Sequence, residues 1–389
     1  MHAELPEPSP DAAAASHALT QIIAAEIDAG GGWMSFSRYM ELALYAPGLG
    51  YYSGGAHKFG DHESGGDFLT APELTPLFGQ ALARQIAQIV QASAPMVIEA
   101  GAGSGRLAAD LLPALDALGA LPTHYRILEL SGELRARQHA TLAAHAPAYL
   151  DRVEWLDELP ERFSGCLIGN EVLDAMPTHA VHWTSDGIEE GGVSVVDGRL
   201  CASQRPARAA LSSAATALGV EAPYRGDISL AARVWVGELA RRLDQGALLL
   251  LDYGLTRREL YLPQRDGGTV RCHYRHRVHD DPFWYPGLSD ITSHVDFTAV
   301  AEAAFDAGLS VLGYTAQANF LINCGIGELL LARVGAGGTA SNADLKAQGA
   351  VNILLSPNEM GELFKVIALG KGIDQPLLGF SRGDRTHAL

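Results

Sequence analysis

The feature that most constrains the fold is a run of alternating apolar strands and helices between residues 96 and 169. A predicted strand over residues 96–100 leads into the glycine-rich loop GAGSG, and a predicted helix over residues 107–118 follows. Strands that alternate with helices at this spacing form a mostly parallel sheet with helices on both faces. The run continues with a helix over residues 131–144 and strands over residues 125–130, 152–156 and 166–169.

The same alternation resumes in the second half of the chain, after an interval that breaks it. Within that interval, residues 179–183 and 193–200 are typical of a strand hairpin with a turn at Asp197-Gly198. A segment over residues 257–291 is dense in His, Arg, Asp and Pro and is predicted to be a long loop. The resumed pattern comprises helices over residues 230–243, 297–307 and 320–334 and strands over residues 247–253, 309–316 and 364–369.

One α/β domain with two additions accounts for this organisation. Residues 50–70 hold many glycines and are predicted to form a lid loop. The sequence TAPE at residues 70–73 is typical of a capping box, which predicts a helix that continues through Val90. We expect a flexible tail over residues 1–16, an N-terminal helical extension with the lid loop over 17–72, a core over 73–177 and 229–389, and an inserted hairpin or flap over 178–228.

Composition and charge argue against several classes of function. The chain has 389 residues with 28 Lys and Arg against 45 Asp and Glu, a formal net charge of −17. Such a surface repels phosphate backbones and anionic lipid, so we expect no nucleic-acid partner, whereas a basic protein segment would be attracted. No apolar run suits membrane insertion, and the N-terminus has no signal-peptide pattern, so a cytoplasmic protein is expected. The cysteines lack the paired spacing of a disulfide framework or zinc site: Cys166, Cys201, Cys272 and Cys324.

The glycine loop restricts the kind of ligand that the chain would bind. A phosphate-binding P-loop requires a lysine that this loop lacks, and a dinucleotide-binding loop requires a small residue where Arg106 stands. The pattern Glu99-x-Gly101-x-Gly103-x-Gly105 is instead typical of class I S-adenosylmethionine methyltransferases. Glu99 would then face the cationic methionine end of the cofactor. A tight strand-to-helix turn without a ligand is the alternative interpretation.

Three further residues are predicted to contact this cofactor. Glu129 follows the second strand, 24 residues after Gly105, where a carboxylate can accept hydrogen bonds from both ribose hydroxyls. Trp155 in the third strand would form an apolar wall for the adenine, and Asn170 ends the fourth strand. A solvated glutamate and a core tryptophan remain the alternatives for Glu129 and Trp155.

Acidic residues after the fourth strand are the candidates for catalysis. Ligands of open α/β sheets bind where the strand order reverses, and the fourth strand is expected to lie beside the first at that point. Glu171 follows this strand directly, and a helical turn would place Asp174 on the same side. The alternative is that Asp174 caps a short helix.

Several blocks of the sequence resemble the MidA-like protein arginine methyltransferases, a family that includes a mitochondrial complex I assembly factor. The resemblance extends from about residue 36 to about residue 369. It implies a class I methyltransferase (Rossmann-like) fold with a mostly parallel seven-stranded sheet, S-adenosyl-L-methionine as cofactor and, in the mitochondrial members, symmetric dimethylation of an arginine on a complex I subunit. This chain lacks their presequence, so its own substrate stays open. The blocks are GGDFLTAPELTPLFGQ, IEAGAGSGRL, YRILELS, LIGNEVLDAMP, LLLDYG and TVRCHYRHRVHDDPFWYPGLSDITSHVDF.

An arginine substrate would give the acidic residues defined roles. The guanidinium is delocalised and stays charged, so it is a poor nucleophile. Glu171 and Asp174 would pair with two of its nitrogens and direct the third towards the methyl group. The alternative for Glu171 is that it only contacts the cofactor. His294, after the long loop, would bind substrate or accept a proton, with a role in a helix cap as the alternative.

Other functions suit the sequence less well. A non-catalytic assembly protein on the same scaffold has no physical need for the loop glycines, Glu129 or Asn170. A NAD-dependent oxidoreductase is disfavoured by Arg106. Residues 271–281 hold three His, a Cys and two Asp that would line a helix face as a metal site, but interleaved arginines and the nearby Pro282 argue against it. We therefore expect no metal.

Overall fold

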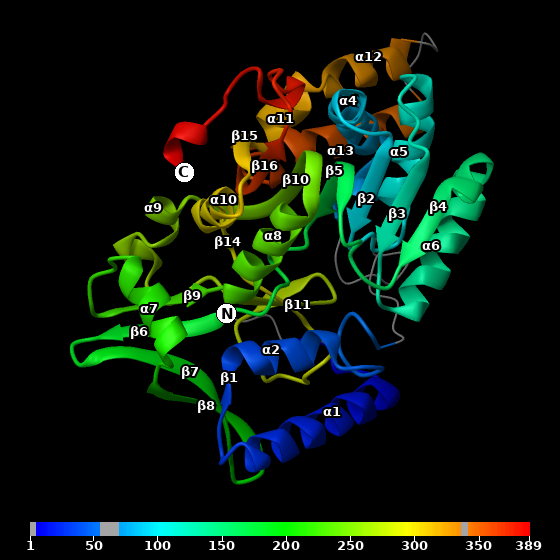
Figure 1. Cartoon of the computed structure of the whole chain (residues 1–389). Coiled ribbons are helices and arrows are strands. Elements are labelled where there is room, and N and C mark those ends of the chain that lie inside the picture. Colours follow the sequence, from blue (N-terminus) through cyan, green and yellow to red (C-terminus); the bar gives the residue numbers. More distant parts are fainter. Residues whose placement is uncertain (1–4, 55–69, 336–340) are drawn as a thin grey trace. The chain divides into compact units, whose positions relative to one another are not determined.

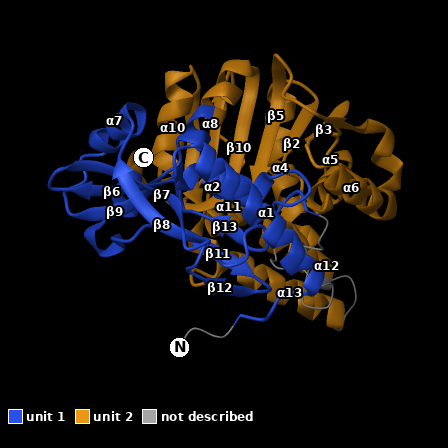
Figure 2. Cartoon of the chain, turned by 90° about the horizontal axis from the view of Figure 1, so that it is seen from below, with its two compact units in different colours: residues 1–68, 173–234, 257–296 blue, residues 69–172, 235–256, 297–389 orange. Residues whose placement is uncertain are grey.

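The computed structural model describes residues 5–54, 70–335 and 341–389. The chain forms two compact units, each assembled from three segments, which Figure 2 distinguishes by colour. Most of the predicted lid loop, residues 55–69, lies outside the described residues. Unit 1 comprises residues 1–68, 173–234 and 257–296, and unit 2 comprises residues 69–172, 235–256 and 297–389.

Unit 2 is built on a seven-stranded sheet in the order β15–β16–β10–β5–β2–β3–β4 (Figure 1). Every neighbouring pair is parallel except the two pairs that β16 forms. The predicted mostly parallel sheet is therefore confirmed. The strands are β2 Met96–Ala100, β3 His124–Leu128, β4 Val153–Leu156, β5 Phe163–Asn170, β10 Leu243–Leu255, β15 Ser310–Ala316 and β16 Phe364–Lys371.

The order of the strands reverses between β2 and β5. From β2 the chain adds β3 and then β4 on one side, whereas β5 pairs with the other side of β2 and is followed by β10. The predicted position of the fourth strand beside the first is confirmed. The carboxyl ends of β2 and β5 thus lie at the point of an open sheet where ligands bind.

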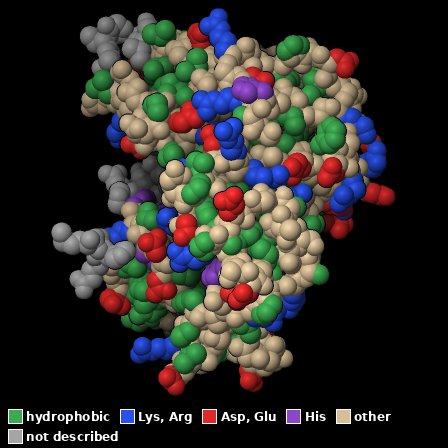
Figure 3. Space-filling view, turned by 90° about the vertical axis from the view of Figure 1, so that its left-hand side faces the viewer, with side chains coloured by type: hydrophobic (Ala, Val, Ile, Leu, Met, Phe, Trp, Pro, Cys, Tyr) green, Lys and Arg blue, Asp and Glu red, His purple; other side chains and the backbone are tan. Residues whose placement is uncertain are grey.

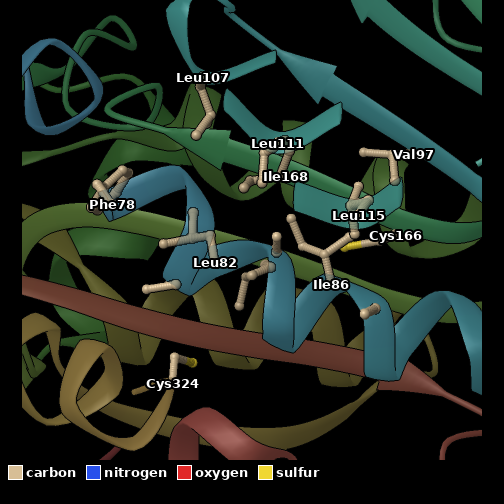
Figure 4. Close-up of a cluster of buried hydrophobic side chains, with 14 of the residues drawn as sticks. Phe78, Leu82, Ile86, Val97, Leu107, Leu111, Leu115, Cys166, Ile168 and Cys324 are labelled. Carbon is tan, nitrogen blue, oxygen red and sulfur yellow. The ribbon is translucent and has the colours of Figure 1, made fainter. Parts of the chain in front are cut away.

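Helices of unit 2 pack on this sheet through a buried apolar cluster (Figure 4). On α4, apolar side chains recur every four residues, as a helix with one buried face requires. Burial of each leucine-sized side chain stabilises the fold by about 1.5–3 kcal/mol. The cluster includes Phe78, Leu82 and Ile86 of α4, Leu107, Leu111 and Leu115 of α5, Val97 of β2 and Ile168 of β5. The helices are α3 Ala71–Leu74, α4 Pro76–Ala92, α5 Arg106–Ala117, α6 Gly132–His145, α10 Phe297–Asp306, α11 Gln317–Asn323, α12 Ile326–Gly335, α13 Asn342–Leu355 and α14 Met360–Leu363.

Two predicted helices of unit 2 are interrupted. The helix expected from Thr70 is divided into α3 and α4, because the proline at position 76 disfavours a helical conformation at Thr75. Thr75 caps α4 by accepting a hydrogen bond from the Leu77 N–H over 3.3 Å, whereas Thr70 makes no such bond. The helix expected over residues 320–334 is divided into α11 and α12 at Gly325, whose φ of 78° ends a helix.

Unit 1 contains two antiparallel sheets and an N-terminal pair of helices. In the larger sheet β8, β7, β6 and β9 pair in that order, and β1 also pairs with β7. The predicted turn at Asp197-Gly198 is confirmed between β7 and β8, where both residues have positive φ. The elements are α1 Pro10–Ala29, β1 Met34–Ser35, α2 Phe36–Tyr45, β6 His179–Thr184, β7 Gly187–Val196, β8 Arg199–Pro206, α7 Ala209–Ala217 and β9 Tyr224–Ile228, with α8 Leu230–Arg242 beginning in unit 1 and ending in unit 2.

Two segments of unit 1 are more ordered than their sequences indicate. The first helix, predicted to start at residue 17, begins at Pro10, because Ser9 caps it and proline suits the first helical turn. The predicted loop over residues 257–291 contains a helix and a three-stranded sheet, whose strands are too short to show alternation. These elements are α9 Arg257–Leu260, β11 Arg271–Tyr274, β12 Arg277–His279 and β13 Asp290–Thr292, followed by β14 Val295–Asp296.

The surface carries charges of both signs. On the face in Figure 3, Lys and Arg side chains are interspersed with Asp and Glu, and hydrophobic side chains are scattered between them. Within the described parts of the chain, no helix has the length and apolar character needed to cross a membrane.

Candidate functional site

The glycine loop between β2 and α5 has a backbone conformation that other residues avoid. Gly101, Gly103 and Gly105 have φ angles of 67°, 52° and 84°, in the left-handed region. A Cβ atom at Gly105 would also lie 2.9 Å from the Cα of Gln138 on α6. Gly105 precedes α5 and has no side chain to cap it, so the first N–H groups of α5 face the loop.

A glutamate from α3 forms a hydrogen bond with this loop. The Ser104 hydroxyl donates a hydrogen bond to Oε1 of Glu73, and the Arg106 N–H donates to the Ser104 hydroxyl over 3.2 Å. The sequence pattern assigned Glu73 to a capping box, so this contact was missed. Its partner is 31 residues away along the chain, a separation that no local pattern reveals.

Glu99 is buried within the sheet. Its Oε2 accepts a hydrogen bond from the Tyr125 hydroxyl on β3 over 2.6 Å. Burial raises the pKa of Glu99 to about 7, although the hydrogen bond from Tyr125 lowers it. The carboxyl group is therefore partly protonated near neutral pH, and its contact with the methionine end of a cofactor stays a prediction.

Glu129 follows β3 and is half-buried. Its Oε1 accepts a hydrogen bond from the Ser131 N–H over 2.9 Å, and its Oε2 accepts one from Nε2 of Gln138 over 3.1 Å. Burial raises the pKa of Glu129, while these two hydrogen bonds and the charge of Arg135 lower it. The Leu130 N–H also lowers this pKa, and a carboxylate has about four acceptor sites, so Glu129 keeps acceptor capacity beyond these protein partners. Glu129 is thus oriented at the strand end rather than free in solvent.

Trp155, the residue predicted to line the adenine, lies on β4, and Asp157 lies in the loop after it. The indole N–H of Trp155 donates to Oε1 of Gln138 over 2.9 Å, so its ring packs against α6. Asp157 is exposed and pairs with Arg135 over 2.7 Å. Leu130, directly after Glu129, is 79% exposed, and sequence reasoning did not single it out.

Asn170 and Glu171 form the end of β5. Asn170 donates from Nδ2 to Oε1 of Glu171 over 2.9 Å, and its buried Oδ1 has no hydrogen-bond partner among the described residues. Glu171 has a φ of 55°, which is strained for a residue other than glycine. Its N–H donates to the Leu251 carbonyl over 2.8 Å, and the next N–H, of Val172, donates to Oδ2 of Asp252 over 3.1 Å.

Asp174 and His294 belong to unit 1. The Ser293 N–H donates to the Asp174 carbonyl over 2.9 Å, so the segments that carry Asp174 and His294 are adjacent. The His294 N–H donates to the Thr269 hydroxyl over 3.0 Å. The helical turn expected from residue 171 to residue 174 is wrong, because the left-handed backbone of Glu171 cannot begin one.

A stacked pair of tyrosines lies beside a buried carboxyl group of unit 1. The rings of Tyr45 and Tyr52 stack with centroids 5.5 Å apart, and the Tyr52 hydroxyl donates to Oδ1 of Asp290 over 2.9 Å. Burial raises the pKa of Tyr52 well above its ordinary value, and the charges of Asp290 and Asp174 raise it further. Asp174 and Asp290 are 3% and 4% exposed, and the charges of both act on the Tyr52 hydroxyl.

Several other reactive side chains lie in buried positions. Burial raises the pKa of the Cys166 thiol to about 12, which disfavours the thiolate that a nucleophile requires. Residues 271–279 form the β11–β12 hairpin instead of a helix face. Burial lowers the pKa of His273 to about 4, and His279 lies 3.0 Å from the Ser289 hydroxyl. Among the described residues, no three His, Cys, Asp or Glu side chains are arranged to hold a metal ion.

The chain matches the model of one protein family over residues 81–315, and that family is described as "Putative S-adenosyl-L-methionine-dependent methyltransferase". Among solved structures, a Burkholderia thailandensis protein with bound S-adenosyl-homocysteine is 52% identical. The TM-score is 0.95, and the match covers 99% of this chain and 100% of that chain. Class I methyltransferase architecture is thus shared with a relative that holds the demethylated cofactor.

Curated relatives are more distant. The mitochondrial protein arginine methyltransferase NDUFAF7 of Danio rerio is 28% identical over 376 residues, which cover 87% of this chain and 83% of that protein. The Drosophila melanogaster homolog is 29% identical over an alignment of 424 positions that covers 97% of this chain and 92% of that protein. Both matches cover more than four fifths of this chain and of the related protein.

Proposed function

Because the chain belongs to the S-adenosyl-L-methionine-dependent methyltransferase family matched over residues 81–315, we propose that it methylates an arginine of a protein substrate. The observation that carries the cofactor assignment is the left-handed glycine loop with the oriented carboxylate of Glu129 at the end of the next strand. The glycine loop follows β2, where the strand order reverses, and Glu129 follows the neighbouring strand β3 at the same edge of the sheet.

The residues at this sheet edge fit the proposed cofactor. The backbone of Gly101 to Gly105 can approach the ligand closely, because no side chain intervenes. Glu129 has acceptor capacity for the two ribose hydroxyls, and the exposed side chain of Leu130 offers an apolar surface for the adenine. The buried Oδ1 of Asn170, which no described residue satisfies, gives a further acceptor at the end of β5.

Bound S-adenosyl-L-methionine supplies an electrophilic methyl group on a sulfonium. The protein mainly has to align a nucleophile with that group, because methyl transfer is an in-line displacement. We assign Glu171 in unit 2 to the guanidinium, whose charge it would draw away from the reacting nitrogen. In unit 1 we assign Asp174 to a cationic substrate and His294 to the proton that a methylated nitrogen releases.

Three observations support an arginine as the acceptor. The relatives that match most of the chain are named protein arginine methyltransferases. Asp174 and Asp290 of unit 1 lie beside the stacked pair of Tyr45 and Tyr52, and carboxylates with aromatic faces suit a planar cation. The formal net charge of −17 favours the approach of a basic segment.

The test is methyl transfer to proteins in a lysate from cells that lack this protein. The wild type and Glu171→Gln are each incubated with labelled S-adenosyl-L-methionine, and labelled residues are identified by mass spectrometry. We expect methylarginine with the wild type and a strongly reduced rate with Glu171→Gln at unchanged cofactor affinity. Glu359→Gln, an exposed glutamate of unit 2 outside the site, is the matched control and should retain full activity.

The possible results separate the parts of the proposal. Label on a residue other than arginine would overturn the substrate class and keep the methyltransferase assignment. Binding of the cofactor without any transfer would favour a non-catalytic assembly protein. A Glu171→Gln variant that labels the same protein at the wild-type rate would remove Glu171 from catalysis.

A further inference from the structure

Gln138, in the middle of α6, connects three elements of the candidate cofactor site. Its Nε2 donates to the Gly103 carbonyl and to Oε2 of Glu129, each over 3.1 Å. Its Oε1 accepts the indole N–H of Trp155 over 2.9 Å. One side chain therefore holds the glycine loop after β2, the carboxylate after β3 and the tryptophan of β4.

The burial of Gln138 makes these contacts costly to lose. The side chain is 0% exposed, and a buried amide without hydrogen bonds costs about 1–3 kcal/mol. Gln138 and Leu142 are the buried residues of α6, four positions apart on one face of the helix. If this face of α6 served only to pack against its neighbours, an apolar residue would suit position 138. The amide of Gln138 is therefore explained by its hydrogen bonds to Gly103, Glu129 and Trp155.

The orientation of the amide follows from its neighbours. An indole N–H can only donate, so the amide atom that faces Trp155 must be the oxygen. Both N–H bonds of the amide then point towards the Gly103 carbonyl and Glu129. These two acceptors use both donors of Nε2, so Trp155 determines how Gln138 holds Glu129.

We propose that Gln138 is the positioning residue for the adenosine half of the cofactor site. The inference rests on the proposed cofactor site. Gln138 fixes the direction of the Glu129 carboxylate and the path of the loop carbonyl at Gly103 before the ligand arrives. It also favours the ionised form of Glu129, the form that accepts from both ribose hydroxyls. Arg135, on the same helix, is the charged side chain that acts on Glu129 in the same direction.

The test is calorimetry with S-adenosyl-homocysteine on the whole protein, from pH 5 to pH 9. Gln138→Met keeps the length of the side chain and removes all three hydrogen bonds. We expect its affinity to fall by about 10- to 100-fold near neutral pH, as for other residues that orient a ligand-binding group. The pH below which affinity declines should move upward, because Glu129 loses a donor that lowers its pKa.

Gln85 on α4 provides a matched control. It is also 0% exposed in unit 2, donates to Oε1 of Gln88 over 3.1 Å and accepts from the Gly379 N–H over 2.8 Å. Gln85→Met should therefore lower the thermal stability as Gln138→Met does. Its affinity for S-adenosyl-homocysteine and the pH dependence of that affinity should equal those of the wild type.

Two further variants keep the test decisive. If Gln138→Met does not fold, Gln138→Glu retains the acceptor for Trp155, removes the donors and should show the same upward shift in pH. Trp155→Phe leaves the donors of Gln138 in place and should reduce affinity less than either. A wild type that binds no S-adenosyl-homocysteine would contradict the proposed function itself. A wild type that binds, with a Gln138→Met that matches its affinity and pH profile, would overturn only the positioning role.

Discussion

The two units of the molecule assemble their candidate functional residues differently. In unit 2 the glycine loop and Glu129 each follow a parallel strand and Asn170 ends one, so the sheet brings them to one edge. In unit 1, Asp174 is held beside residues 293–294 by a hydrogen bond between segments distant in the sequence. A sequence motif can predict a site whose residues follow neighbouring strands, as in unit 2. A site assembled from distant segments, as in unit 1, is recognised only in the structure.

If this difference has a functional meaning, substitutions of the glycine loop and Glu129 in unit 2 should alter cofactor affinity, and substitution of Asp174 in unit 1 should alter turnover alone. The largest effect is expected for Gly103→Val. A branched side chain at a φ of 52° is strained by up to about 3 kcal/mol and also blocks the approach of the backbone to the ligand. Calorimetry should show a loss of S-adenosyl-homocysteine affinity of about 1000-fold or more.

A glycine outside the loop controls for backbone strain. Gly119, after α5, has a φ of 64° and open space where a Cβ would stand. Gly119→Val should be destabilised comparably and bind as the wild type does. Equal losses of affinity in the two variants would mean that the glycine loop has no special relation to the ligand.

The pH dependence of stability should have opposite signs at two glutamates, one in each unit. Glu99 of unit 2 has a pKa raised to about 7 by burial, so the folded state keeps a proton that the unfolded chain loses near pH 4.5. Its contribution to stability therefore falls as pH rises between these values, by about 3 kcal/mol in total. In urea unfolding, Glu99→Gln should gain stability relative to the wild type over this range.

Glu26 of unit 1 shows the reverse. The hydrogen bond from Arg38 lowers the pKa of Glu26, so its contribution is present above the ordinary pKa and is lost as pH falls through the lowered value. Glu26→Gln should lose stability near neutral pH and approach the wild type in acid. The same sign of change in both variants would contradict this contrast between the units.

Glu129→Ala should weaken the binding of S-adenosyl-homocysteine by about 10- to 100-fold, because hydrogen bonds to a charged acceptor contribute about 1.5–3 kcal/mol each. Isothermal titration at pH 8 measures the change with the wild-type carboxylate ionised. Glu133→Ala, two residues into α6 and exposed, is the control. A change of less than threefold for Glu129→Ala would speak against a ribose ligand.

The smallest effect is expected in unit 1. Asp174→Asn should slow methyl transfer by about 10-fold and leave S-adenosyl-homocysteine affinity within twofold of the wild type, because it removes a charge assigned to the substrate alone. Parallel measurements of single-turnover rate and calorimetric affinity separate the two quantities. If Asp174→Asn lost affinity for S-adenosyl-homocysteine, Asp174 would not act on the substrate alone.

The sequence allowed much of unit 2 to be predicted, because its information is local. The strand of residues 96–100 and the three loop glycines follow from hydrophobic pattern and turn chemistry. Gln138 was missed because its partners come from three other elements. Its presence on the buried face of α6, four residues before Leu142, is the signal that would have revealed it.

Unit 1 was harder to predict for a related reason. Strands as short as Arg277–His279 provide too few residues for a period of two to be recognised. Such short strands are stabilised by pairing with strands elsewhere in the chain. The intrinsic β-propensity of a residue does not describe this pairing. Glu171 of unit 2 illustrates a similar limit at one residue, since its left-handed backbone contradicted the expected helical turn.

The connection that Gln138 makes between the glycine loop and Glu129 bears on inhibition by the reaction product. Glu129 and Leu130 are proposed to contact adenosine, and Gln138 positions Glu129 for this contact. Adenosine is a part that S-adenosyl-L-methionine and S-adenosyl-homocysteine have in common. Contacts with the shared adenosine contribute equally to the affinity for S-adenosyl-homocysteine and for S-adenosyl-L-methionine. Discrimination must then arise at the sulfur, and turnover in the cell would follow the ratio of the two compounds rather than the concentration of either.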